Sequence, residues 1–315
     1  MYIFIVNPVA GNGRGYKIFK KLSKSMIYQQ IIAEYYLTEY PGHAEEITKN
    51  ISKGSHVELK AIIVIGGDGT IHEVMNGLKN TNTAVSFIPG GSGNDFGRGS
   101  GITGSPISIL KKIVEDTSGI PYWNGDYNIS GSSKRSFINS IGFGFDAEIA
   151  AKANLSTYKK FFNVLHLGKL SYVIALIQVL FKFKPIQVEL HLDGHTESMT
   201  DCWMVTVANH PYYGGGMKII PSAKIEADLL PVLVIQGISK WKILGLFLTV
   251  FTGRHIQFKE VTLYKAKKLT ITAKSNITYQ VDGQTDTCQS CVITKNIQPI
   301  QIMGSDFSLK LSQTS

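Results

Sequence analysis

The chain has 315 residues, of which 43% are hydrophobic and 17% charged, with a net charge of +9. This composition excludes a disordered chain, and the length favours two domains. The basic balance favours anionic partners, namely nucleotide phosphates, nucleic acid or an acidic membrane, without choosing among them. Three cysteines are too few for a disulfide framework, and Cys288 and Cys291 lack the second ligand pair of a zinc site.

The first 90 residues alternate between strand and helix patterns. Buried strands are predicted at 2–6, 32–38, 61–65 and 84–88, and helices at 16–30, 43–53 and 71–78. Strands that alternate with helices predict a parallel sheet. The start at 1–6 is too short for a secretory signal, so it is assigned to the first strand.

The pattern changes near Trp123 to short segments bounded by turn residues. Strands are predicted at 187–192, 203–208, 230–236, 261–263, 269–273 and 278–281, and helices at 166–181 and 239–252. This pattern is typical of an antiparallel sandwich or barrel. We therefore expect an α/β domain at 1–125 and a β-rich domain at 126–298, with the tail at about 299–315 free to return to the first. The longest apolar run, 172–181, is too short to span a bilayer, so any membrane contact is expected to be peripheral.

Three glycine-rich loops each follow an apolar strand in the first half. They are N-P-V-A-G-N-G at 7–13, G-G-D-G-T at 66–70 and P-G-G-S-G-N-D at 89–95. Glycine lets a backbone approach phosphate closely, and its N–H groups attract negative charge. One such loop is ordinary punctuation between strand and helix, but three on adjacent strands would form one phosphate cradle. None of the three is a Walker A loop.

The longer segments around these loops resemble one family. G-G-D-G-T-I-H-E-V-M-N-G-L at 66–78 and I-P-G-G-S-G-N-D-F-G-R at 88–98 are similar to motifs of the diacylglycerol kinase catalytic-domain family, which includes sphingosine, ceramide and bacterial lipid kinases. T-E-Y-P-G-H-A at 38–44, F-I-N-S-I-G-F-G-F-D-A at 137–147 and Y-G-G-G-M-K-I-I-P-S-A at 213–223 extend the resemblance over nearly the whole chain.

The resemblance implies a 6-phosphofructokinase-like α/β domain that binds ATP and a β-rich antiparallel sandwich that admits a lipid. The residues that it assigns to ATP are Asn7, Pro8, Gly11, Thr38, Gly66, Gly67, Gly69, Thr70, Glu73, Ser92, Asn94 and Asp95. Asp68 is expected to organise Mg²⁺, because an acid among phosphate loops faces phosphate only with a metal between them. Asp68 and Asp95 are also placed where aspartate caps a helix, and that alternative stays open.

Two acidic positions depart from the family pattern. The family motif D-G-E, whose glutamate would act as general base, is Asp282, Gly283 and Gln284 here. Glutamine cannot accept a proton, so Asp282, Asp286 or a water molecule is left as a candidate substitute for the base. Asp282-Gly283 also predicts a hairpin turn. The metal-binding acid expected after Pro221 is replaced by E-A-D-L-L-P at 226–231, which leaves Glu226 and Asp228 as candidate ligands.

The sequence therefore predicts a cytoplasmic, peripherally membrane-associated kinase that transfers phosphate from ATP, with Mg²⁺, to a lipid hydroxyl, diacylglycerol being the default acceptor. The alternative is a catalytically impaired paralogue that binds nucleotide or lipid as a regulator. A soluble-substrate kinase such as an NAD kinase is a third option, which the motifs of the second half disfavour. No motif indicates nucleic-acid binding, and the β-rich domain leaves a homodimer open.

Overall fold

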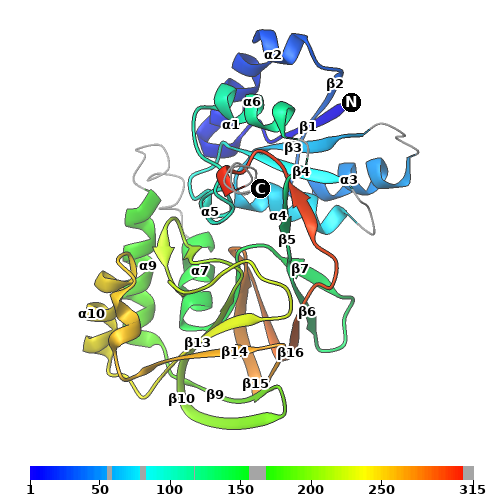
Figure 1. The fold of residues 1–315 in the computed structure, drawn as a ribbon. Coiled ribbons are helices and arrows are strands. Elements are labelled where there is room, and N and C mark those ends of the chain that lie inside the picture. The colour runs from blue at the N-terminus through cyan, green and yellow to red at the C-terminus, as the bar shows by residue number, and fades with distance from the viewer. Residues whose placement is uncertain (55–58, 79–82, 117, 156–167, 308–315) are drawn as a thin grey trace. The chain divides into compact units, whose positions relative to one another are not determined.

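The computed structural model describes residues 1–315 apart from 55–58, 79–82, 117, 156–167 and 308–315 (Figure 1). The chain divides into two compact units. The first comprises Met1–Tyr122 and Gln298–Ser315, and the second comprises Trp123–Ile297.

The first unit is built on a mostly parallel sheet. Its strands are β1 (Tyr2–Val6), β2 (Ala33–Leu37), β3 (Ala61–Gly66), β4 (Ala84–Pro89), β5 (Ile120–Tyr122) and β17 (Ile300–Ile302). The order is β2-β1-β3-β4-β17-β5, and β5 is the antiparallel member. Every residue of β1 and β3 is buried, as expected for central parallel strands covered on both faces.

Six helices of this unit lie in the described residues. They are α1 (Ala10–Leu22), α2 (Met26–Gln29), α3 (His43–Lys53), α4 (Asp68–Gly77), α5 (Asp95–Gly99) and α6 (Pro106–Glu115). The prediction of one helix over 16–30 was wrong, because α1 ends at Leu22. The Ser25 hydroxyl then accepts the Tyr28 N–H at 3.4 Å and caps α2.

The last described strand of the chain belongs to the first sheet. β17 lies between β4 and β5, and the Met303 N–H donates to the Val85 carbonyl at 2.9 Å. The Ser86 hydroxyl donates to the Met303 carbonyl at 2.8 Å. A segment from the end of the chain therefore completes the α/β unit.

The second unit is dominated by an antiparallel nine-stranded sheet. Its strands are β6 (Gly125–Ile129), β7 (Arg135–Phe137), β8 (Ser140–Gly144), β9 (Ile186–Leu192), β10 (His195–Ala208), β13 (Leu230–Gln236), β14 (Val261–Ala266), β15 (Lys268–Val281) and β16 (Gln284–Lys295). A separate two-stranded sheet joins β11 (Tyr212–Tyr213) to β12 (Met217–Lys218). The strands predicted at 269–273 and 278–281 are one strand, β15, whose register shifts between Thr272 and Ile277.

Helices cover part of this sheet and form a second apolar cluster with it. They are α7 (Phe145–Leu155), α9 (Gly168–Lys182), α10 (Lys240–Val250) and the 3₁₀ turn η1 (Arg254–Gln257). Phe145, Phe183 and Trp203 meet at its centre with ring centroids 5.3 Å apart in each pair. Among the described residues, no helix is long and apolar enough to cross a membrane. The chain thus has the predicted fold class, a parallel α/β unit and a β-rich antiparallel unit.

Candidate active site

The three glycine-rich loops lie together at one edge of the first unit's sheet. They follow β1, β3 and β4, which are neighbours in the sheet. The N–H groups of Gly90 and Gly91 donate to the Gly66 carbonyl at 2.7 and 2.9 Å. Arg14 ties the first loop to the third, because its guanidinium donates to the Gly90 carbonyl at 3.2 Å and to that of Gly91. The loops therefore form one continuous surface at the carboxyl ends of the strands, where open α/β sheets bind ligands.

Close backbone contact explains why two positions must be glycine. A Cβ on Gly11 would lie 2.3 Å from the Gly90 oxygen, and Gly11 has a φ of +56°. A Cβ on Gly91 would lie 2.5 Å from the Gly67 Cα. Any side chain at these positions would force the first and second loops away from the third.

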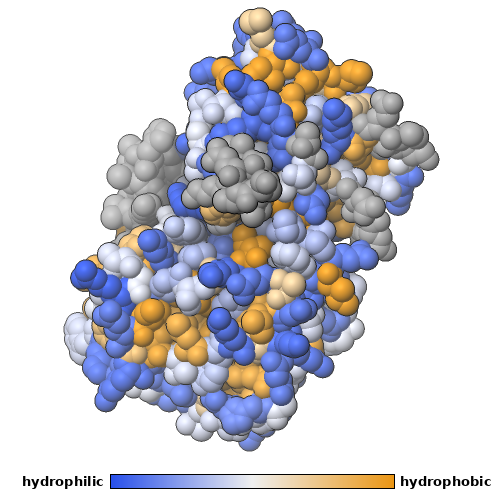
Figure 2. All heavy atoms as spheres, in the orientation of Figure 1, coloured by the Kyte–Doolittle hydropathy of each residue, from blue (hydrophilic) through white to orange (hydrophobic). Residues whose placement is uncertain are grey.

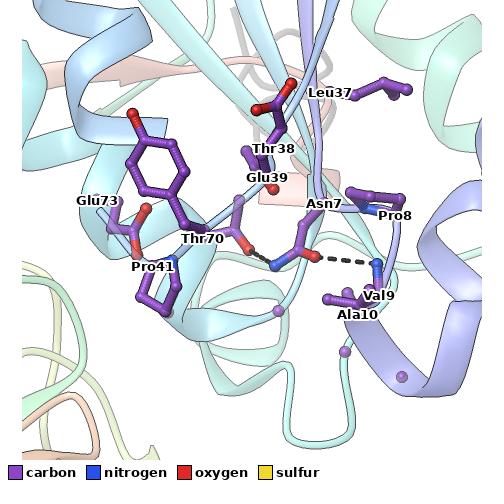
Figure 3. A pocket seen from close by; sticks show the side chains of 15 residues that line it. Asn7, Pro8, Val9, Ala10, Leu37, Thr38, Glu39, Pro41, Thr70 and Glu73 are labelled. Carbon is purple, nitrogen blue, oxygen red and sulfur yellow. Dashed lines mark hydrogen bonds between the residues drawn. The ribbon is translucent and has the colours of Figure 1, made fainter. Parts of the chain in front are cut away.

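A cavity of about 720 Å³ opens beside the loops (Figure 3). Its volume is in the range of small-molecule sites. The predicted residues that line it are Asn7, Pro8, Gly11, Thr38, Gly67, Gly69, Thr70 and Glu73. Gly66, Asp68, Ser92, Asn94 and Asp95 are not among the described residues that line it.

Seven further lining residues were not assigned from the sequence. They are Val9, Ala10, Leu37, Glu39, Tyr40, Pro41 and Gly91. Leu37 ends β2, the edge strand beside β1, and Glu39 to Pro41 follow it. The rule that ligands bind beyond the carboxyl ends of parallel strands therefore applies to these residues as well. The Tyr40 ring stacks on His43, with centroids 4.5 Å apart and planes 5° apart, and its hydroxyl donates to Glu46 at 2.9 Å.

Asn7 joins the first loop to the second at the cavity wall. Its Nδ2 donates to the Thr70 Oγ1 at 3.0 Å, and its Oδ1 accepts the Val9 N–H at 3.2 Å (Figure 3). Both side chains are therefore fixed by each other. The two loops present these polar groups from neighbouring strands, β1 and β3.

Glu73 caps a neighbouring helix from the cavity wall. Its carboxylate accepts the Gly42 N–H at 2.9 Å and the Ala44 N–H at 3.2 Å, at the start of α3. The first N–H groups of a helix have no partner within the helix, and a negative charge there is favourable. The carboxylate thus fixes the segment after β2 against α4.

Asp68 begins α4 and reaches the third loop. Its Oδ1 accepts the Phe96 N–H at 2.9 Å, so the carboxylate also serves the start of α5. Its Oδ2 lies 2.8 Å from where a Cβ of Gly93 would stand. A side chain at position 93 would therefore displace the Asp68 carboxylate.

The three predicted site residues of the third loop, Ser92, Asn94 and Asp95, differ in exposure. Asp95 is 4% exposed and pairs with Arg98, Oδ1 to Nη1, at 2.7 Å. Asn94 has a φ of +58°, and its side chain closes the turn through two hydrogen bonds to Gly91, of 2.9 and 2.8 Å. Ser92 is exposed. Asp95 and Asn94 thus have structural partners, whereas the Ser92 hydroxyl faces solvent.

In the second unit, Asp282 and Gly283 form the two-residue hairpin turn between β15 and β16. Val281 pairs with Gln284, and Asp282 and Gly283 both have positive φ, 48° and 90°. This is the turn that an Asp-Gly pair favours. Gln284 is the exposed first residue of β16.

The Asp282 carboxylate is held by three consecutive backbone donors. It accepts the N–H groups of Ile138 at 2.8 Å, Asn139 at 2.8 Å and Ser140 at 3.0 Å. Ile138 and Asn139 lie between β7 and β8, Ser140 begins β8, and all three residues are under 5% exposed. Asp282 therefore anchors the hairpin turn to the neighbouring strand connection.

Buried polar side chains fix the segment that carries these three backbone donors. Asn209 donates to the carbonyls of Phe137 and Ile138 at 3.1 and 3.0 Å, and the Lys295 ammonium donates to the Asn209 Oδ1 at 2.6 Å. Burial lowers the pKa of Lys295 to about 8, against the opposing charges of Glu226 and Asp126. Lys295 thus supports, through Asn209, the segment that anchors Asp282.

His210 supports the same segment from another side. One ring nitrogen, Nε2, lies 2.9 Å from the Asn139 Oδ1, and Nδ1 accepts the Tyr212 N–H at 3.2 Å. With Nδ1 accepting, a neutral ring donates from Nε2. Burial lowers the pKa of His210 to about 4, which keeps the imidazole neutral at physiological pH.

Glu226 and Asp228 lie in the connection between β12 and β13. Both are exposed, and Asp228 has a φ of +67°. Within the part of the chain that the structure describes, no group of three or more His, Cys, Asp or Glu side chains is arranged to hold a metal ion.

A small apolar cavity of about 40 Å³ lies between the helices and the sheet of the second unit. Its lining comes from α7, α9, β10, β13, α10 and the segment at 213–219, and it includes Asp146. Burial raises the pKa of Asp146 to about 7, against hydrogen bonds from Gln280 and Thr206. Its Oδ1 has no hydrogen-bond partner among the described residues. The motif at 137–147 contained this acid, but its apolar surroundings become visible only in the folded unit.

Comparisons with known proteins agree with this architecture. The model of the diacylglycerol kinase catalytic domain matches residues 1–119, and that of the YegS C-terminal NAD kinase beta sandwich-like domain matches residues 139–303. A Bacillus subtilis protein named "Putative lipid kinase YtlR" is 34% identical over 288 residues, which are 90% of this chain and 93% of that protein. A diacylglycerol kinase of Mycobacterium tuberculosis strain H37Rv is 26% identical over 277 residues, 84% of this chain and 82% of that one.

Solved structures show the same fold. The structure of a "putative diacylglycerol kinase" from Bacillus anthracis strain Sterne superposes with a TM-score of 0.74 at 22% identity, covering 98% of this chain and 96% of that one. The sheet, its bonded glycine loops and the antiparallel second unit define an α/β-plus-β protein of the kind that these matches share. The chain belongs to the diacylglycerol kinase catalytic-domain family, with the C-terminal sandwich-like domain that accompanies it.

Proposed function

We propose that the protein is an ATP-dependent lipid kinase that transfers the γ-phosphate of ATP to a lipid hydroxyl, with diacylglycerol as the default acceptor. The carrying observation is the set of three mutually bonded glycine loops beside a cavity of about 720 Å³. Family membership and relatives named as diacylglycerol kinases support the lipid acceptor.

The nucleotide would be held mainly by backbone. Gly11, Gly67, Gly69 and Gly91 line the cavity without side chains that would keep phosphate oxygens away from their N–H groups. The N-terminus of α4, which follows Gly67, adds its positive end to the same edge. Asn7 and Thr70 add polar side chains, and Thr38 and Ser92 add hydroxyl groups for the rest of the nucleotide.

Mg²⁺ would lower the charge repulsion between ATP and the attacking hydroxyl. Asp68 fits such an ion, because a carboxylate beside phosphate is the oxygen ligand that Mg²⁺ prefers and the Phe96 N–H fixes its orientation. Asp95 supports this arrangement through its pair with Arg98. We keep Glu226 and Asp228 as a proposed second source of metal ligands in the other unit.

Removal of the proton from the attacking hydroxyl is the step for which this chain lacks the family's base. A general base contributes about 10²- to 10⁴-fold in rate, and the amide of Gln284 cannot serve as one. Asp282 is tied to three backbone donors, which suits it to position the turn. These facts favour slow transfer, or the alternative of a catalytically impaired paralogue that binds nucleotide or lipid as a regulator.

The acceptor side of the proposal rests on the second unit. The small cavity lined by Leu176, Met204 and Leu246 has an apolar wall that would suit the aliphatic chain of an acceptor, although its volume of about 40 Å³ would have to widen to admit one. With ATP and a lipid as substrates, we also propose that the protein works in the cytoplasm at the membrane surface, as a peripheral protein. A homodimer remains part of the proposal.

The test is the transfer of labelled phosphate from ATP to diacylglycerol in mixed micelles, with and without Mg²⁺. Native protein is compared with Gln284→Glu and with Gln289→Glu, which adds the same charge to an exposed position of the same strand. Activity that depends on lipid and Mg²⁺ supports the kinase, and a gain of about 10²- to 10⁴-fold in Gln284→Glu alone locates the missing base. ATP binding without transfer in any variant would favour the regulatory alternative. Activity without lipid would favour a soluble acceptor.

A further inference from the structure

Helix α10 is apolar on both of its sides. Ile243, Leu246 and Val250 are buried in the helical cluster of the second unit. On the outer side Trp241 is 74% exposed and Leu248 is 75% exposed. These two residues are seven positions apart, so they lie on one face. An ordinary surface helix turns mainly polar residues to solvent, whereas the outer side of α10 exposes these two large apolar residues beside its lysines.

The end of α9 extends the apolar outer side. The rings of Phe181 and Trp241 meet edge to face with centroids 6.3 Å apart, and the Lys240 ammonium donates to the Phe181 carbonyl at 2.8 Å. Figure 1 shows the two helices side by side. We define the α9–α10 face by its exposed apolar residues, which are Ile177, Phe181, Trp241, Leu248 and Phe251. In Figure 2 hydrophobic and hydrophilic side chains alternate over the helical side of this unit.

The two segments that carry the face contain basic residues and no acidic ones. The segments 168–184 and 237–257 contain no Asp or Glu. The basic residues that flank the exposed apolar ones are Lys182, Lys184, Lys240, Lys242 and Arg254. Lys242 pairs with Glu260 at 2.7 Å, and Glu260 belongs to the segment before β14. Aromatic and aliphatic side chains with a basic rim are typical of surfaces that enter an anionic lipid interface.

We propose that the α9–α10 face docks on an anionic phospholipid bilayer, with Trp241, Phe181 and Leu248 inserted among the lipids. A second copy fits this face less well, because a symmetric dimer would set the same lysines against one another. Aromatic rings with lysine neighbours, by contrast, suit the boundary between headgroups and acyl chains.

The two helices that carry the docking face also line the apolar cavity of the same unit with their inner sides. Ile243, Leu246 and Leu176 line that cavity from α10 and α9, whose outer sides form the face. Under the proposed function, the bilayer that holds the face would also supply the acceptor lipid. The docking itself does not depend on phosphoryl transfer, so it can be measured without ATP.

The experiment is co-sedimentation of the full chain with phosphatidylcholine vesicles, with and without phosphatidylglycerol, in the absence of ATP. The native protein should bind the anionic vesicles, and less strongly as salt rises. Leu248→Ser should weaken binding roughly tenfold by loss of apolar insertion. Lys182→Gln should weaken it about fivefold on anionic vesicles alone.

Matched controls separate insertion from general stickiness. Met26→Ser removes an apolar side chain of equal exposure, 75%, from α2 of the other unit and should leave binding unchanged. Vesicle binding should shift the tryptophan emission to the blue, because Trp241 is exposed whereas Trp203 is 2% exposed. Trp241→Phe should bind vesicles without that shift.

Two results would overturn the docking surface. One is vesicle binding that Leu248→Ser and Lys182→Gln leave unchanged while both variants stay folded by circular dichroism. The other is a native dimer in sedimentation that Leu248→Ser dissociates without loss of vesicle binding, since the face would then be a subunit interface. Vesicle binding without phosphoryl transfer would leave the surface standing and count only against the proposed function.

Discussion

The two Asp-Gly hairpin turns of the second unit allow a matched test of how much a carboxylate bound to buried N–H groups contributes to stability. Asp282 and Asp193 both precede glycine, and their φ values are 48° and 49°. Replacement by glycine suits such a φ, so Asp282→Gly removes the carboxylate without adding backbone strain.

The expected loss of unfolding free energy follows from the three backbone N–H groups that Asp282→Gly leaves without the carboxylate. Three hydrogen bonds to a charged acceptor, at about 1.5–3 kcal/mol each, would sum to about 5–9 kcal/mol if none were replaced. The turn is partly exposed, so water takes over some of them. We expect Asp282→Gly to lower the free energy of unfolding of the second unit by about 3 kcal/mol.

Asp193→Gly supplies the comparison. The Asp193 carboxylate accepts the N–H groups of Lys267 at 3.0 and 2.8 Å and of Lys268 at 2.9 Å. Both lysines are exposed, so water satisfies their donors once the carboxylate is gone. We expect a loss of about 1 kcal/mol or less.

The assay is urea unfolding followed by tryptophan fluorescence. All three tryptophans, Trp123, Trp203 and Trp241, belong to the second unit, so the signal reports on that unit. Equal losses in the two variants would refute the reasoning, because burial of the donors would then not matter. A neutral Asp282→Gly would show that the anchor does not form in solution.

Gly11→Ala should weaken ATP binding in calorimetry by at least about tenfold, because its Cβ would meet the Gly90 oxygen at 2.3 Å; Gly13→Ala, which has positive φ but no neighbour within 4 Å, should have a smaller effect. Asp146→Asn should gain thermal stability relative to the native protein as pH rises from 4 to 8. The native carboxyl, whose pKa is raised from 3.8 to about 7, binds a proton that the unfolded chain releases in this range, so native stability falls there by about 4 kcal/mol. An unchanged difference between the two proteins across that range would contradict the raised pKa. Gly93→Ala should raise the Mg²⁺ concentration that any transfer activity requires, since its Cβ would lie 2.8 Å from the Asp68 Oδ2 and displace the proposed metal ligand.

Strand periodicity predicted the central elements of both units well. The segment at 61–65 is β3, 230–236 is β13, and the helix at 43–53 is α3. These elements were predictable because a buried run or an amphipathic face is a pattern of neighbouring residues. Short elements such as β5, β7 and β17, each of three residues, were not predicted. Their conformation depends on partner strands far away in sequence rather than on their own pattern.

The candidate site was predictable where it consists of glycine and unpredictable where it consists of contacts. Gly11 and Gly67 could be selected from the sequence because three glycine-rich loops each follow a strand of one parallel sheet, and the carboxyl ends of such strands meet at one edge. That Glu73 caps α3, or that Asp282 binds three backbone N–H groups, depends on segments 29 to 144 residues away. No local pattern carries such information.

The position of β17 means that the sheet of the first unit is completed only after the second unit has been synthesised. β4 has no partner on its outer side until residues 300–302 have been synthesised, because β17 lies between β4 and β5. The second unit, at 123–297, is made in full before that happens. During translation the β4 edge therefore stays open, and an open edge invites pairing with other chains. A stop codon just before residue 298 would spare the antiparallel unit and leave the three glycine-rich loops on an unfinished sheet.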